Sequence, residues 1–156
     1  MFLHIRIYKY KKYERKREGY FMSLDIKDLK RAFGKRAREY AHDKEKTKIL
    51  VLDAMEKAKN MDVEDQIDTF IENLKLLLSV TKDWSNGSYK EIPTGSIVII
   101  IIGIIYFLVP TDLIADFLPA GFVDDAFVLG LVIRQVSKDL EKYKIWKDRL
   151  QAVQSI

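Results

Sequence analysis

The chain has 156 residues, of which 32% are charged and 48% hydrophobic, and its net charge is +4. These averages are those of an ordinary globular protein of about one domain. The absence of cysteine excludes disulfides, a thiolate zinc site and a thiol nucleophile. The averages hide a strong segregation, because no basic residue lies between Glu91 and Arg134.

Residues 1–21 form a basic segment with seven basic and two acidic residues. It lacks the apolar core of a secretory signal. One interpretation is a basic arm for anionic lipid or nucleic acid. The other, which we expect, is that Met22 is the true start and residues 1–21 are translated upstream sequence. Met22-Ser-Leu-Asp resembles a natural beginning, and Arg17-Glu18-Gly19 can be encoded by a purine-rich run like a ribosome-binding site.

Residues 22–84 are predicted to form a module of two or three amphipathic helices. Ser23 can cap a first helix in which Leu29 and Phe33 lie on one face, and Gly34 should bend or divide it. A second helix, Lys44 to Lys59, places Ile49, Leu52 and Met55 near one face, with Leu50 as a further candidate. Asp62 is the expected N-cap of a third helix that continues to Trp84. We interpret these apolar stripes as core.

Residues 85–96 read as a linker with a turn at Asn86-Gly87, and residues 97–136 read as a hydrophobic helical hairpin. Its first arm, Ile97 to Val109, is apolar or aromatic except at Gly103. As a helix this arm reaches about 20 Å, short of a hydrocarbon core of ~30 Å. A shallow or re-entrant membrane hairpin therefore fits better than two full spans. Basic residues on both flanks would keep both termini cytoplasmic.

A soluble bundle is the alternative, since an apolar run of this length is often a buried core helix. Covering both arms would then require most of the N-terminal helices as a coat. Trp84 and Trp146 flank the hairpin and fit either interfacial anchors or core positions.

The turn of the hairpin carries four aspartates, Asp112, Asp116, Asp124 and Asp125. Clustered carboxylates repel one another in a low dielectric, so a proton or a hard cation such as Mg²⁺ or Ca²⁺ could relieve the charge. We favour the other interpretation, in which Asp112 and Asp124 cap helix N-termini and the remaining carboxylates pair with basic residues. No catalytic residue and no cofactor is expected.

This hairpin resembles the YkvA-like family, domain of unknown function 1232. The resemblance rests on Tyr106-Phe-Leu-Val-Pro110-Thr-Asp-Leu-Ile-Ala-Asp-Phe-Leu-Pro119-Ala-Gly-Phe-Val-Asp124-Asp125 and covers about Ile97 to Val136. The chain departs from the family pattern at Ala115, where a second proline is usual. The resemblance implies a small, mostly bacterial, membrane-associated helical protein, and it carries over no activity and no catalytic residue.

The predicted fold is therefore all-α, closed by a basic amphipathic helix within residues 137–156 that lies along a membrane surface. The expected function is a non-enzymatic membrane adaptor or structural element, self-associating through Gly103 and Gly130 or bound to a membrane protein, without nucleic acid. One alternative is a carboxylate-rich cation or proton site in membrane helices, as in a transport accessory or a metal-dependent enzyme. Another is a soluble helical bundle that binds a protein partner.

Overall fold

The computed structural model describes residues 25–60, 68–108 and 125–155, and all regular structure within these ranges is helical. Six helices follow in chain order in the described part: α3 (Ile26–Ala41), α4 (Lys44–Lys59), α5 (Asp68–Ser85), α6 (Thr94–Leu108), α8 (Asp125–Gln135) and α9 (Ser137–Gln154). The predicted all-α class is confirmed. The predicted caps Ser23 and Asp62 lie outside the described residues.

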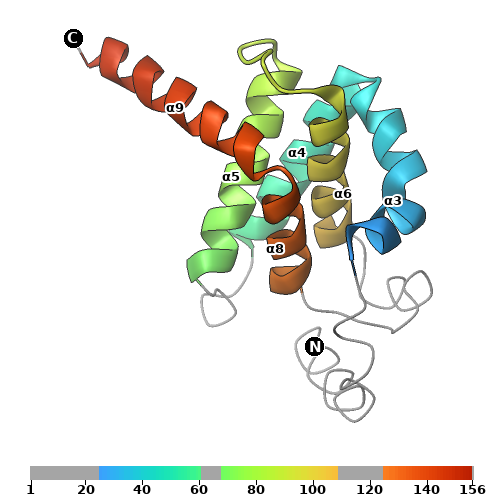
Figure 1. Ribbon diagram of the computed structural model, residues 1–156. Helices are drawn as coiled ribbons and strands as arrows, with labels where there is room; N and C mark the ends of the chain where they lie inside the picture. The colour runs from blue at the N-terminus through green and yellow to red at the C-terminus, as the bar shows by residue number, and fades with distance from the viewer. Residues whose placement is uncertain (1–24, 61–67, 109–124, 156) are drawn as a thin grey trace.

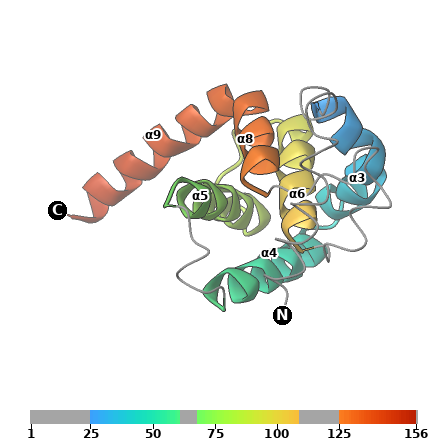
Figure 2. The same ribbon diagram turned by 90° about the horizontal axis from the view of Figure 1, so that it is seen from below.

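Helix α6 occupies the middle of the bundle, with α3 and α5 on opposite sides of it (Figures 1 and 2). It also contacts α4 and α8. Because α6 has no polar face, it can only be stable where apolar partners surround it. Every residue of α6 from Ile99 to Phe107 is buried. The helices of residues 22–84 therefore act as a coat for α6, which is the arrangement that the soluble alternative required.

Helix α3 begins at a capping box rather than at Ser23. The Asp25 carboxylate accepts hydrogen bonds from the backbone N–H groups of Lys27 and Asp28, and the Asp28 side chain accepts one from the Asp25 N–H. These bonds satisfy N–H groups that the first helical turn leaves unpaired. The helix then continues through Gly34 to Ala41, so this glycine does not divide it into two pieces.

Helix α4 corrects the predicted core. Its buried face consists of Thr47, Leu50, Val51 and Ala54. Of the residues assigned to the core, Leu50 is buried, whereas Ile49, Leu52 and Met55 point outward and are 60%, 63% and 42% exposed. Two apolar stripes therefore run along this helix, and only one of them packs inward. Thr47 lies on the inward stripe, where its hydroxyl is satisfied by donating a hydrogen bond to the Tyr40 carbonyl at 2.6 Å.

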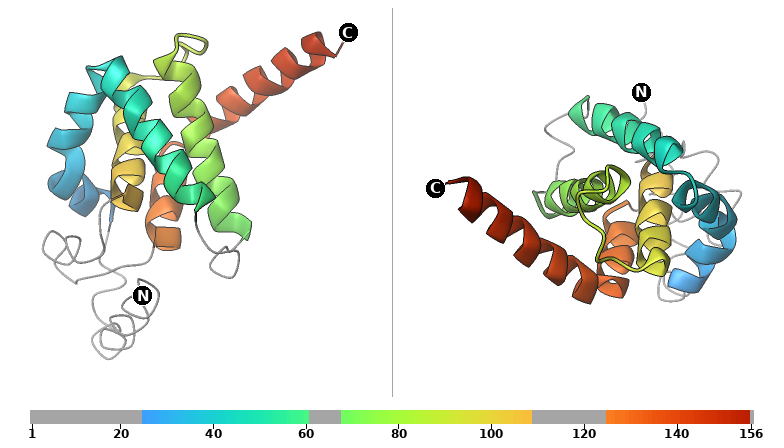
Figure 3. Two further views of the ribbon diagram at one scale, coloured as in Figure 1. Left: turned by 180° about the vertical axis from the view of Figure 1, so that it is seen from behind. Right: turned by 90° about the horizontal axis from the view of Figure 1, so that it is seen from above.

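Helix α9 leaves the bundle. Its first half packs through Leu140 and Tyr143, whereas its second half extends away from the other helices (Figure 3). From Ile145 onward three large apolar side chains are exposed, those of Ile145, Leu150 and Val153. The helix spans Ser137–Gln154, as the sequence predicted.

Candidate functional site

The four aspartates that the sequence singled out cannot be placed together. Asp112, Asp116 and Asp124 lie outside the described residues, and Asp125 is the first residue of α8. The described ranges contain no group of three or more His, Cys, Asp or Glu side chains arranged to hold a metal ion. The predicted capping by Asp112 and Asp124 and the alternative cation site at the hairpin turn therefore both stay predictions.

The two apolar helices that flank this turn pack directly against each other. A Cβ atom on Gly103 of α6 would lie 3.3 Å from a Val132 methyl carbon and 3.5 Å from Leu129 on α8. Gly103 thus allows the close approach of α6 to α8 within one chain. Gly130, by contrast, faces open space. The prediction that both glycines serve self-association is therefore contradicted at Gly103, which is used inside the bundle.

A lysine that the sequence analysis did not single out binds a carbonyl at the C-terminal end of α6. The Lys57 ammonium of α4 donates a hydrogen bond to the Phe107 carbonyl and lies 4.6 Å from the centre of the Phe107 ring. A cation at a helix C-terminus is favoured by the unpaired carbonyls and by the helix dipole. No spacing rule points to this lysine, because its partner is a main-chain atom fifty positions away.

A polar network fastens α9 to α5. The Tyr143 hydroxyl donates to the Asp83 carboxylate at 2.6 Å and lies 2.6 Å from the Ser79 hydroxyl, while the Lys147 ammonium donates to the same carboxylate at 2.9 Å. Burial, and then the hydrogen bond to Asp83, raise the pKa of Tyr143 well above its ordinary value of 10.0. The phenol stays protonated as a hydrogen-bond donor, so the network stabilises the contact between α9 and α5 and does not supply a nucleophile.

An aromatic cluster covers this network. Tyr89 packs edge-on against Tyr143, with ring centres 5.1 Å apart, and lies 4.9 Å from the Trp146 ring. The Tyr89 hydroxyl is buried and has no hydrogen-bond partner among the described residues. Burial and the nearby Glu91 and Asp139 carboxylates raise its pKa. Trp84 is also buried, and Trp146 is half-buried, so in this arrangement both tryptophans pack against the protein.

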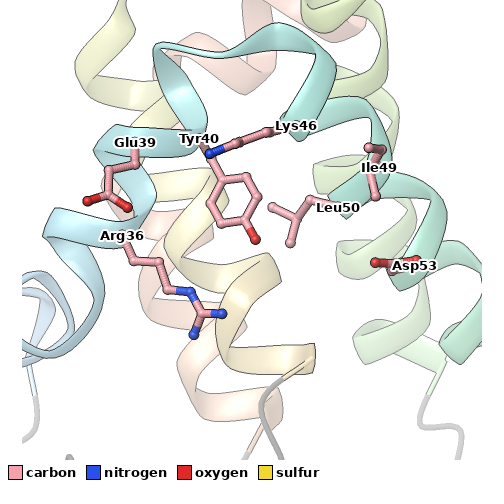
Figure 4. Close-up of a pocket in the computed structure, with 7 residues that line it drawn as sticks. All are labelled: Arg36, Glu39, Tyr40, Lys46, Ile49, Leu50 and Asp53. Carbon is pink, nitrogen blue, oxygen red and sulfur yellow. The ribbon is translucent and has the colours of Figure 1, made fainter.

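Two surface hollows adjoin α4. The first, of about 280 Å³, lies between α3 and α4, and Figure 4 shows Tyr40 and Leu50 at its centre with charged side chains around them. Its cations, Arg36 and Lys46, are accompanied by the acids Glu39 and Asp53, so it selects neither sign of charge.

The second hollow, of about 340 Å³, lies between α4 and α5 and is different in character. It is lined by five apolar residues and two lysines, Met55, Ala58, Lys59, Ile71, Leu74, Lys75 and Leu78. We call this hollow, together with the exposed Leu52 about one helical turn before Met55, the α4–α5 face. No acidic residue lines the hollow, so its chemistry suits an apolar group with a negative charge at one end.

Comparison with known proteins shows which family the chain resembles. A family model described as "Protein of unknown function (DUF1232)" matches residues 96–131, which include most of α6 and the first part of α8. The "Uncharacterized membrane protein YkvA" of Bacillus subtilis (strain 168) is 33% identical over 78 residues, which cover 49% of this chain and 74% of that relative. No solved structure matches the chain. None of the described helices is both long and apolar enough to cross a membrane. From its match over most of the relative's length, the chain belongs to the YkvA-like family.

Proposed function

We propose that this protein is a non-enzymatic adaptor or structural element that docks on a membrane with its helical bundle closed. The relative from Bacillus subtilis is described as a membrane protein, and the similarity covers most of that protein. A non-enzymatic role is supported by a composition with two histidines and no cysteine, which leaves few residues for nucleophilic catalysis.

The observation that carries the proposal is the distribution of exposed apolar side chains. The exposed large hydrophobic residues of the described part lie on two outer helices, α4 and α9. Exposed apolar groups gathered in this way mark surfaces that bind proteins or membranes. Both helices also carry many lysines, which anionic lipids attract.

Insertion of the α6–α8 pair is the finer form of this proposal, with both termini on the cytoplasmic side. Basic residues favour that side, and they lie before the pair at Lys82 and Lys90 and after it from Arg134 onward. For insertion, α3, α4 and α5 would have to leave α6. Buried side chains of those three helices, such as Leu29 and Leu74, would lose their cover, and exposing one buried leucine to water costs about 1.5–3 kcal/mol. The summed cost of exposing several such residues exceeds the usual net free energy of unfolding of a domain, about 5–15 kcal/mol. We therefore favour docking of the closed bundle.

Membrane fractionation of the full chain, followed by a wash with alkaline carbonate, tests the proposal. We expect the protein to sediment with membranes and to be released by the wash, as a docked protein is. Retention until detergent is added would show that the α6–α8 pair inserts. A chain that never sediments would contradict membrane docking. That result would favour the second candidate, a bundle that binds a protein partner, which the complete coverage of α6 also supports.

A further inference from the structure

The α4–α5 face combines exposed large apolar side chains with an apolar hollow. Leu52 and Met55 are 63% and 42% exposed although α4 has a complete buried face without them. Next to them, the hollow between α4 and α5 has an apolar lining. Figure 3 shows α4 as the outer helix on this side of the bundle, so no described helix covers this face.

The charge on this face has one sign at the hollow. Lys59 and Lys75 line it from the two helices, and both side chains are exposed. No ion pair joins either lysine to another described residue. Two free ammonium groups beside an apolar hollow attract a ligand that is anionic at one end and apolar at the other.

We propose that the α4–α5 face binds the anionic phospholipid of a bilayer surface, an inference that rests on the proposed membrane docking and names its surface. Lys59 and Lys75 bind the lipid phosphate groups. Leu52 and Met55 enter the boundary between headgroups and acyl chains, where apolar side chains of surface helices lie. The hollow of about 340 Å³ is large enough to take the upper part of an acyl chain.

Flotation of the full chain with lipid vesicles measures the headgroup preference. We expect strong binding to an equal mixture of phosphatidylglycerol and phosphatidylcholine and weak binding to phosphatidylcholine alone. The double variant Lys59→Gln/Lys75→Gln should lower binding to the anionic vesicles about 30-fold, which corresponds to about five-fold for each lysine at the surface. Neither substitution breaks an ion pair with a described residue, so the fold should be unchanged.

The matched control is Lys35→Gln/Lys90→Gln, which removes the same charge from exposed lysines on α3 and on the connection between α5 and α6. These lysines are not part of the α4–α5 face, so this pair should lower binding far less. Equal loss from both pairs would mean that only net charge matters, and it would overturn the proposal. Equal binding to vesicles with and without phosphatidylglycerol would overturn it as well.

A second measurement does not depend on lysines. Since the chain has no cysteine, Leu52→Cys carries a single environment-sensitive fluorophore, with Lys35→Cys as the control position. On adding anionic vesicles, the label at position 52 should shift to the blue and the label at position 35 should not. A wild-type chain that floats while the label at 52 stays unchanged would sink this inference and leave membrane docking standing.

Two further outcomes separate the remaining cases. A blue shift at position 52 that depends on protein concentration without vesicles would show that a second copy covers this face, and it would contradict the lipid assignment. A wild-type chain that floats with neither kind of vesicle would contradict the proposed membrane docking itself.

Discussion

Helices α6 and α4 use apolar residues in opposite ways. In α6 apolar side chains surround the helix, and every residue from Ile99 to Phe107 is buried in the bundle. In α4 Leu50, Val51 and Ala54 face inward, whereas Leu52, which is as large as Leu50, faces outward with Ile49. The contrast shows that apolar size alone does not decide burial, because a helix with two apolar stripes can bury only the one that its neighbours cover.

The sharpest test of this contrast places one substitution in each helix. Ile101→Asn in α6 should lower the free energy of unfolding by about 3–5 kcal/mol, because it leaves a cavity and an unpaired amide in a fully buried site. Leu52→Asn in α4 should change it by less than about 0.5 kcal/mol. Urea unfolding followed by circular dichroism measures both. Similar losses from both variants would mean that the outward stripe of α4 is covered.

The packing of α6 against α8 is tested by a pair of glycines. Gly103→Leu should destabilise the protein by about 1–3 kcal/mol, because its side chain would meet Val132 and Leu129. Gly130→Ala should stabilise it by up to about 1 kcal/mol, since a helical glycine in open space gains helix propensity from a methyl group. Thermal melts compare the two. A neutral Gly103→Leu variant would show that α8 can move away from α6.

Helix α9 lies between these extremes, since it contacts the bundle up to Lys147 and extends away from it beyond that residue (Figure 3). Tyr143→Phe should cost about 1–2 kcal/mol, because it removes the donor to Asp83 and the partner of Ser79. Tyr89→Phe is the matched control and should be neutral or stabilising, because its buried hydroxyl has no partner among the described residues. A loss from Tyr89→Phe equal to that from Tyr143→Phe would contradict this assignment of the two hydroxyls.

The same network gives a pH dependence. The pKa of Tyr143 is raised in the folded protein above its ordinary value of 10.0, so the folded state holds this proton more tightly than the unfolded state does. Its contribution to stability is complete below pH 10 and is lost as pH rises toward the folded-state pKa. The stability difference between wild type and Tyr143→Phe should therefore stay constant up to about pH 10 and shrink between about pH 10 and pH 12. A constant difference over this window would contradict a protonated, buried phenol.

The smallest effect is expected from divalent cations. If the aspartates of the hairpin turn act as caps and ion-pair partners, millimolar Mg²⁺ or Ca²⁺ should leave the melting temperature unchanged. A cation-dependent rise that Asp116→Asn/Asp125→Asn abolishes would establish a carboxylate site instead.

Several features of the candidate surfaces follow from the sequence and others do not. The apolar arm around Ile101 and the boundaries of the C-terminal helix are local patterns, and the structure has both. The α4–α5 hollow joins Lys59 to Lys75 across two helices, and such a meeting depends on how the helices cross. Lys57 at the Phe107 carbonyl is likewise a contact between distant parts of the chain.

The sequence by itself determined that the protein is helical and that the run of isoleucines must leave water, because both depend on residues within a few turns of one another. Only the tertiary structure decided where that run goes. Helices α3, α4, α5 and α8 surround α6. The choice between the two apolar stripes of α4 was also tertiary, since burial depends on which face the neighbouring helices cover. The apolar pattern of α4 alone does not say which of its faces the neighbouring helices cover.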